Sequence, residues 1–308
     1  MSHFVKLNTD SWFVIANPTS GNRNFSKQWC KIQQNLKLNN IDYSFTFTQF
    51  SKHEIELVQA AIQKGFRNII SVGGDGTLHN VVNGIMLQTY IKTSELTIGV
   101  IPLGTGNDWI KTYSIPNSIE KSIEIIKRKK ITLQDIGVLK TDNKTTYFNN
   151  VAGLGYDGYI VNKLKSLKKF GSISYVLAGI YGLLFYKKSI FKIIFKGKIL
   201  ETNCLMTIIG ICQFSGGGMQ FTKDVNSSDG LLDITVAKNL TFFNMILNLP
   251  KLYSGKIVHH KKVATYKTKE ITILPVNSKP FIQADGELIG VGKVTVKIIE
   301  KALKFVIS

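Results

Sequence analysis

Short buried-strand patterns alternate with helical patterns over the first 130 residues, and this alternation constrains the fold more than any other feature of the chain. Apolar or β-branched runs at 12–16, 43–48, 68–72 and 96–101 are each followed by a segment whose apolar residues recur at helical spacing. Parallel strands need a long crossover connection, usually a helix, so strands that alternate with helices form a parallel sheet covered on both faces. We therefore expect an α/β domain with a parallel sheet over residues 8–131.

The pattern changes after Ile131. Short β-like runs dominate from 132–139 to 303–307, and Gly or Asp-Gly turns separate many of them. Two segments with helical spacing, 159–186 and 242–252, interrupt these runs. This predicts a β-sandwich or barrel with helical insertions over residues 132–308.

The chain is strongly basic, with 39 Lys and Arg against 20 Asp and Glu, a net charge of +19. An excess of this size predicts a polyanionic partner: nucleic acid, an anionic membrane surface or a phosphorylated ligand. Residues 158–200 hold nine lysines interleaved with aromatic residues and contain no acid. Such a mixture is typical of membrane-interface segments, although a solvated lysine face over core aromatics has the same composition. No zinc-finger or RNA-recognition signature is present, so we expect no nucleic-acid partner.

Cysteine usage and hydropathy indicate the compartment. The three cysteines, Cys30, Cys204 and Cys212, have irregular spacing, which favours a reducing environment over a disulfide framework. The first ten residues lack the apolar core of a secretory signal, and the longest apolar stretch, 172–186, is too short for a bilayer span. We expect a cytoplasmic protein that lies peripherally at the inner membrane surface.

Three polar, glycine-containing loops follow strands of the predicted sheet, at 17–21, 73–77 and 102–108. The carboxyl ends of parallel strands share one edge of a sheet, where open α/β folds bind ligands. Backbone N–H groups of such loops, with the helix N-terminus that follows Gly73-Gly74, can hold phosphate oxygens, and Asp75 could hold Mg²⁺ beside them. Asp-Gly is also an ordinary turn signal. Neither a P-loop nor a Gly-x-Gly-x-x-Gly before the first helix occurs.

Two further motifs lie in the second half, Ser-Asp-Gly-Leu-Leu-Asp at 228–233 and Gln-Ala-Asp-Gly-Glu at 283–287. Each could be no more than a hairpin turn. However, the chain contains five motifs in a fixed order: Gly-Gly-Asp-Gly-Thr, Gly-Thr-Gly-Asn-Asp, Gly-Gly-Gly-Met at 216–219, and these two. With this series of motifs the chain resembles the bacterial soluble diacylglycerol kinase and lipid kinase family. That family is related to sphingosine and ceramide kinases, and NAD kinases and phosphofructokinases share its first motif.

The resemblance implies an α/β domain, similar to that of NAD kinases, joined to a β-sandwich domain around an interdomain cleft. It also implies transfer of the γ-phosphoryl group of ATP to a lipid hydroxyl, most simply that of diacylglycerol, which gives phosphatidic acid. Glu287 would be the general base and Asp75 a second catalytic carboxylate. The nucleotide would be surrounded by residues of four segments: Asn17, Pro18, Thr19, Ser20 and Gly21; Thr48; Gly73, Gly74, Gly76 and Thr77; and Thr105.

The resemblance further implies a structural Mg²⁺ on the Asp229 carboxylate, with the backbone carbonyls of Asn226 and Leu231. Asp135 matches a carboxylate thought to support an acidic network joining the two domains. The segment before this loop departs from the family, because it reads Thr-Lys-Asp-Val at 222–225 in place of Pro-x-Ala and adds Asp224.

Alternatives stay open on the sequence. The acceptor could be a sphingoid base, ceramide or another lipid alcohol, and an NAD kinase-like activity would also explain residues 73–77. A non-enzymatic basic module that binds a polyanion is the alternative from another functional class. Oligomeric state is not fixed by any pattern, which leaves a homodimer open. His259 and His260 fit an exposed basic loop better than a metal site, because no cysteine or carboxylate stands at ligand spacing.

Overall fold

The computed structural model describes residues 10–21, 24–104, 106–164, 179 and 182–308. The chain forms two compact units, Met1–Gln134 with Lys301–Ser308, and Asp135–Glu300. The sequence placed the change near Ile131 and assigned all of 132–308 to the second domain. In the structure the last eight residues belong to the first unit, because the end of β17 (Val294–Val306) pairs in parallel with β4 (Thr97–Pro102), Lys304 opposite Thr97.

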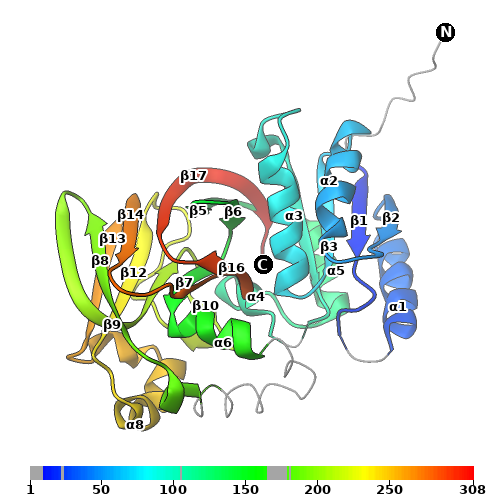
Figure 1. Ribbon diagram of the computed structural model, residues 1–308. Coiled ribbons are helices and arrows are strands. Elements are labelled where there is room, and N and C mark those ends of the chain that lie inside the picture. Colours follow the sequence, from blue (N-terminus) through cyan, green and yellow to red (C-terminus); the bar gives the residue numbers. More distant parts are fainter. Residues whose placement is uncertain (1–9, 22–23, 105, 165–178, 180–181) are drawn as a thin grey trace. The chain divides into compact units, whose positions relative to one another are not determined.

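The first unit is built on a parallel sheet, as predicted. β1 (Trp12–Ala16) lies between β2 (Tyr43–Phe47) and β3 (Asn68–Gly73), and β4 follows β3. The central strands are buried along their length, which explains their continuous apolar runs. Figure 1 shows these strands in blue to cyan beside the helices of this unit.

The helices of the first unit pack in pairs. α1 (Phe25–Leu38) contacts α5 (Ile119–Arg128), and α2 (His53–Gln63) contacts α3 (Asp75–Leu87). Each presents an apolar stripe to its neighbours, such as Trp29, Ile32 and Leu36 of α1. The short helix α4 (Asp108–Thr112) and the 3₁₀ turn η1 (Thr93–Glu95) complete the unit. Because α1, α2 and α3 each connect two strands of the parallel sheet, the loops that precede these helices gather at its carboxyl edge.

The second unit is dominated by antiparallel strands, which confirms the predicted β-rich domain. Its strands run in the order β16 (Glu287–Val291), β15 (Phe281–Ala284), β7 (Val151–Gly155), β9 (Lys198–Gly210), β8 (Ser189–Phe195), β14 (Glu270–Pro275) and β17. β12 (Leu232–Lys238) pairs with the other part of β9 and with β13 (Val263–Thr268). Four further strands accompany them: β5 (Ile131–Lys140), β6 (Thr145–Phe148), β10 (Phe214–Ser215) and β11 (Met219–Gln220).

Helices interrupt the second unit where helical spacing interrupts its sequence. α6 (Tyr156–Leu164) starts three residues before the predicted insertion, and residues 165–178, 180 and 181 of that insertion lie outside the described residues. α8 (Phe242–Tyr253) and the 3₁₀ turn η3 (Lys256–His259) form the second insertion. A buried cluster that includes Leu205, Leu240 and Leu252 joins both insertions to the sheet. Within the part of the chain that the structure describes, no helix is long and apolar enough to cross a bilayer.

Candidate active site

The first two polar loops of the first unit are joined by Asn17. This residue directly follows β1, and its backbone N–H donates to Val72 O of β3 (3.0 Å). Its side-chain Nδ2 donates to Thr77 Oγ1 (3.1 Å), while Oδ1 accepts from the N–H (2.9 Å) and hydroxyl (2.7 Å) of Thr19. Ser20 Oγ lies 3.4 Å from Thr77 Oγ1. The 17–21 loop is therefore held against the start of α3, with Pro18 and Gly21 in the same turn.

Glycine at 73 and 74 allows the second and third loops to touch. A Cβ on Gly73 would collide with the Thr77 side chain, and one on Gly74 would lie 3.2 Å from Gly104 Cα. The backbone N–H of Leu103 donates to Gly73 O (2.8 Å), which fixes this close approach. Gly76 and Thr77 then form the first turn of α3, where the Thr77 N–H donates to Gly74 O (3.0 Å). Thr48 N–H donates to Ala16 O (3.0 Å), so Thr48 lies at the same edge.

The structure thus brings together ten of the eleven residues predicted to surround a nucleotide, all in the first unit. The eleventh, Thr105, lies outside the described residues. Beside the loops is a cavity of about 450 Å³, lined by Gly21, Leu103 and Gly104 together with Gln28, Lys31 and residues 117–120. Lys31 pairs with Glu120, and this hydrogen bond is the main cause that lowers the pKa of Glu120 to about 2. The Lys31 ammonium, which lines this cavity, is therefore already paired with a carboxylate.

Asp75, predicted to be catalytic or to hold Mg²⁺, anchors a neighbouring element. Its two carboxylate oxygens accept the backbone N–H groups of Asp108 (3.0 Å) and Trp109 (3.2 Å) at the start of α4. N–H groups at a helix start lack intrahelical partners, and a carboxylate there is favoured by the helix dipole. Asp75 therefore ties the third loop to α3 through its side chain. Because these oxygens are already acceptors, we derive no step through a metal held by Asp75.

Sequence reasoning missed Glu54. This residue of α2 is 2% exposed, and its carboxylate accepts from Asn17 Nδ2 (3.4 Å) and Asn80 Nδ2 (3.1 Å). A buried carboxylate is costly unless it is hydrogen-bonded, and here it orients the side chain that links the first two loops. The sequence gives little signal for this role, because an acid in the first turn of a helix is an ordinary dipole-favoured choice.

The predicted base, Glu287, lies in the second unit at the start of β16 and is half-buried. The turn before it is fixed by Asp285, whose carboxylate accepts the backbone N–H groups of Asn149 (3.1 Å), Asn150 (3.0 Å) and Val151 (3.1 Å). Asp285 and Gly286 both have positive φ, +50° and +79°. The Asp-Gly-Glu turn is therefore clamped to the start of β7.

A buried polar chain supports the same turn. Gln283 Oε1 accepts the Gly286 N–H (2.9 Å), and Gln283 Nε2 donates to the Asp157 carboxylate on α6. Burial raises the pKa of Asp157 to about 6, although the hydrogen bond from Gln283 acts in the opposite direction. In the sequence, Asp157-Gly158 is an ordinary turn signal. In the structure Asp157 instead lies in the first turn of a helix and acts through Gln283 on the backbone next to Glu287.

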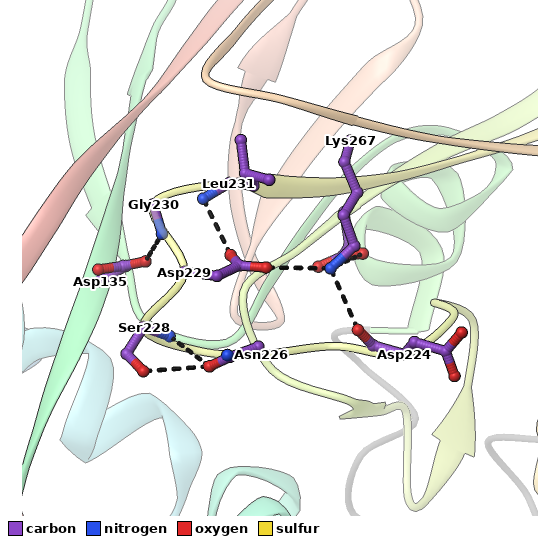
Figure 2. A network of polar contacts seen from close by, with 9 residues as sticks. Asp135, Asp224, Asn226, Ser228, Asp229, Gly230, Leu231 and Lys267 are labelled. Carbon is purple, nitrogen blue, oxygen red and sulfur yellow. Dashed lines mark hydrogen bonds and ion pairs between the residues drawn. The ribbon is translucent and has the colours of Figure 1, made fainter.

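The loop that carries the predicted metal ligands is closed by hydrogen bonds (Figure 2). Asp135 Oδ2 accepts the Gly230 N–H (2.7 Å), and Asp229 Oδ1 accepts the Leu231 N–H (3.0 Å). Asn226 uses its side-chain oxygen to accept from Ser228. The second oxygen of Asp229 faces Lys267, whose Nζ donates to it at 3.1 Å.

We tested whether this donor set fits a divalent cation. Both Asp229 oxygens are engaged, one by a backbone N–H and one by the Lys267 ammonium. Among the described residues there is no group of three or more His, Cys, Asp or Glu side chains able to hold a metal. In this arrangement the residues do not fit a magnesium ion at Asp229, Asn226 and Leu231, and we derive no step through one.

The charges around Lys267 shift each other's titration. Partial burial disfavours its ammonium, but the hydrogen bond to Asp229 and the nearby Asp233 charge outweigh burial and raise the pKa of Lys267. Asp233 is buried, and this burial raises its pKa to about 6, with Lys267 opposing the shift. Burial outweighs the ion pair at Asp233 but not at Lys267, because Asp233 is far more buried than its partner, with side-chain exposures of 5% and 34%.

The fold formed by these two units is known from solved structures. The chain shares it with a diacylglycerol kinase from Bacillus anthracis str. Sterne, with a TM-score of 0.74 at 19% identity over 98% of each chain. It also resembles an NAD kinase from Archaeoglobus fulgidus in complex with ATP, with a TM-score of 0.53 at 14% identity over 96% of this chain and 93% of that one. The architecture is therefore that of the diacylglycerol kinase and NAD kinase-like folds.

Sequence comparison then gives the family. Residues 11–139 match the diacylglycerol kinase catalytic domain, and residues 150–307 match the YegS C-terminal NAD kinase beta sandwich-like domain. A diacylglycerol kinase of Bacillus subtilis (strain 168) is 26% identical over 281 residues, which cover 89% of this chain and 88% of that protein. The chain belongs to the family of bacterial diacylglycerol and lipid kinases that join these two domains, which confirms the resemblance seen in the motifs.

Proposed function

We propose that this protein is an ATP-dependent lipid kinase whose acceptor is the hydroxyl group of diacylglycerol. The single observation that carries the proposal is the convergence of the 17–21, 73–77 and 102–108 loops at one edge of the parallel sheet, through Asn17, Thr77 and the Gly74–Gly104 contact. A phosphate chain is the ligand that clustered backbone N–H groups and a helix N-terminus recognise.

In this proposal the loops of the first unit hold the ATP phosphates, with Thr77 and Thr105 as hydroxyl donors. Phosphoryl transfer depends chiefly on positioning and on neutralising charge, so a rigid set of N–H donors is the main requirement. Asp75 contributes to this rigidity because it fixes α4 to α3, and Glu54 contributes because it orients Asn17. Magnesium enters only as the counter-ion that travels with the nucleotide phosphates.

Glu287 is the base of the proposed reaction. It takes the proton of the lipid hydroxyl as the oxygen bonds to the γ-phosphorus and the bond to the ADP oxygen breaks. The Asp285 clamp and the Gln283 hydrogen bond to Gly286 fix the backbone on which Glu287 stands. This arrangement supports a base role, because efficient proton transfer requires a carboxylate held in one place.

An acceptor lipid is reached from a membrane, and the second unit carries a surface suited to one. Leu247 of α8 and Leu184 are 75% and 55% exposed, and both adjoin the cluster that holds Leu183, Leu249 and Leu252. Residues 234–269, which include α8, contain seven lysines and no acid. Apolar side chains among lysines are what an anionic bilayer surface attracts. The basic segment 158–200 supports the same partner, although several of its residues lie outside the described part of the chain.

The test is phosphorylation of a lipid panel by the purified protein with radiolabelled ATP and Mg²⁺. Vesicles would contain diacylglycerol, ceramide or a sphingoid base, and NAD would be assayed in parallel. We expect label in phosphatidic acid, and a fall of about 10²–10⁴-fold in kcat for Glu287→Gln with nucleotide affinity unchanged.

Glu300→Gln is the matched control, because Glu300 is an exposed acid of the same unit that pairs with Lys269. It should retain full activity. Label in NAD and not in lipid would contradict the lipid acceptor, and undiminished turnover by Glu287→Gln would contradict the base assignment.

A further inference from the structure

The ammonium group of Lys267 lies among the acidic side chains of the 224–233 loop, in the place where a metal ion would neutralise them. Lys267 Nζ donates to Asp229 Oδ2 (3.1 Å) and to the backbone oxygen of Asp224 (3.1 Å), and it forms an ion pair with Asp233 Oδ1 (3.4 Å). An ammonium group carries three N–H donors and no acceptor, so it suits a position surrounded by oxygens. Figure 2 shows the Lys267 side chain reaching into the loop toward Asp229 and Asp224.

Strand pairing places Lys267 at this point. Lys267 on β13 stands directly opposite Asp233 on β12 in an antiparallel pair, and β12 is held on its other side by β9, with Asp233 opposite Gly210. Cross-strand neighbours of opposite charge attract, and the ladder keeps them in register. The loop itself is bent toward the strand, with positive φ at Asp224 and Gly230, and Asp135 secures it from the other side.

The loop therefore has an internal cation. Asp233 has a side chain only 5% exposed, and its Oδ2 is buried without a hydrogen-bond partner among the described residues. Removing the ammonium would leave Asp229 and Asp233 close together with no counter-charge, which a buried carboxylate tolerates poorly. Lys267 thus supplies the neutralisation that a divalent ion would otherwise have to supply.

We propose that Lys267 is the built-in counter-ion of the 224–233 loop, and that this protein orders the loop without a bound divalent metal. The resemblance to the lipid kinase family assigned this place to Mg²⁺ on Asp229, and the chemistry of the donor set assigns it to an ammonium. The inference concerns how the second unit is held together and is independent of which acceptor the enzyme uses.

The experiment measures thermal unfolding and Mn²⁺ binding of the nucleotide-free protein. We expect the wild-type melting temperature to be the same in EDTA and in Mg²⁺, and electron paramagnetic resonance to detect no Mn²⁺ bound through Asp229. Lys267→Met should lower the melting temperature by about 3–6 °C. Mg²⁺ or Mn²⁺ should restore part of this loss, because the variant exposes an uncompensated acidic site.

Lys269→Met is the matched control, since Lys269 lies one residue beyond β13 and donates to an exposed partner, Glu300. It should melt like the wild type and gain no metal response. The proposal is overturned if the wild type binds one Mn²⁺ per chain that Asp229→Asn abolishes, or if Lys267→Met melts like the wild type. If Lys267→Met does not fold, the Mn²⁺ titration of the wild type still tests the proposal, and so does Lys267→Arg. Neither measurement depends on Lys267→Met or on kinase activity.

Discussion

Three aspartates of this protein act as anchors for backbone N–H groups contributed by other segments. The Asp75 carboxylate accepts N–H groups at the start of α4, that of Asp135 accepts the N–H of Gly230, and that of Asp285 accepts the N–H groups of residues 149–151. Hydrogen bonds to charged acceptors are stronger than neutral ones, so a few carboxylates can fix several loops. The carboxylates of the Gly-Gly-Asp-Gly-Thr and Asp-Gly-Glu motifs therefore hold the backbone on which other groups, such as Glu287, depend.

The pH dependence of stability should reveal the buried Asp157. Its pKa is near 6 in the folded chain against 3.8 when unfolded, so the native state binds more protons between these values. The stability contribution is fully present below pH 4 and is lost as pH rises through 6. Asp157→Asn removes this titration. The difference in unfolding free energy, variant minus wild type, should therefore rise by up to about 3 kcal/mol as the pH is raised from 4 to 7.

Urea unfolding of both proteins at several pH values measures this difference. Asp142→Asn, at an exposed position of the same unit, should track the wild type at every pH. A gap between Asp157→Asn and the wild type that does not change with pH would show that burial leaves the Asp157 titration unaltered.

At the scale of elements, the pairing of α2 with α3 positions the phosphate loops. Both helices connect strands of the parallel sheet, and α3 begins at the glycines that meet the third loop. The helices approach closely at Gly84 of α3, where an added Cβ would lie 3.0 Å from Ile55 Cα and from Val58 Cβ of α2. Glycine in mid-helix is unfavourable by itself, so this contact gives the reason for it.

We expect Gly84→Val to destabilise the protein by about 1–3 kcal/mol, because an overpacked contact must push the two helices apart. Equilibrium unfolding in urea measures the loss. Gly290→Val serves as a control, since nothing lies within 4 Å of a Cβ at Gly290. Equal effects of the two substitutions would show that α2 and α3 do not depend on the small residue.

At the scale of the whole molecule, charge is distributed unevenly along the chain. Residues 1–134 hold 15 basic and 9 acidic residues, and residues 135–308 hold 24 and 11. The second half thus carries most of the net charge of +19, together with the exposed leucines of the proposed membrane-facing surface. Long-range attraction between such a surface and anionic lipid is screened by salt.

Vesicle sedimentation tests this surface. Binding to vesicles with anionic lipid should weaken steeply as salt rises, and Leu247→Asn should reduce it about 3–10-fold by removing apolar contact with the bilayer. Leu38→Asn is the control, because Leu38 is 77% exposed but lies on α1 of the first unit. Salt-independent binding, or an equal effect of the two leucine substitutions, would contradict membrane contact through α8.

Much of the fold follows from local patterns. The predicted strands at 12–16, 43–48, 68–72 and 96–101 lie within one residue of the observed β1, β2, β3 and β4. The apolar and β-branched runs of these strands are local patterns, which neighbours in sequence suffice to define. The short helix α4 was missed, because five residues carry too little periodicity and its start depends on a carboxylate 33 residues earlier.

By itself, the sequence determined the alternation of the first unit, the β-rich second unit, the three glycine loops and the motifs that mark the family. These features depend on the spacing of apolar residues and on the backbone freedom of glycine, and both act over only a few positions of the chain. Tertiary structure alone decided that β17 ends beside β4, that Gln283 links Asp157 to the Glu287 turn, and that Lys267 meets Asp229. Each depends on strand register or packing between residues far apart in the chain, and no local pattern records which distant partner a strand or a charge will meet.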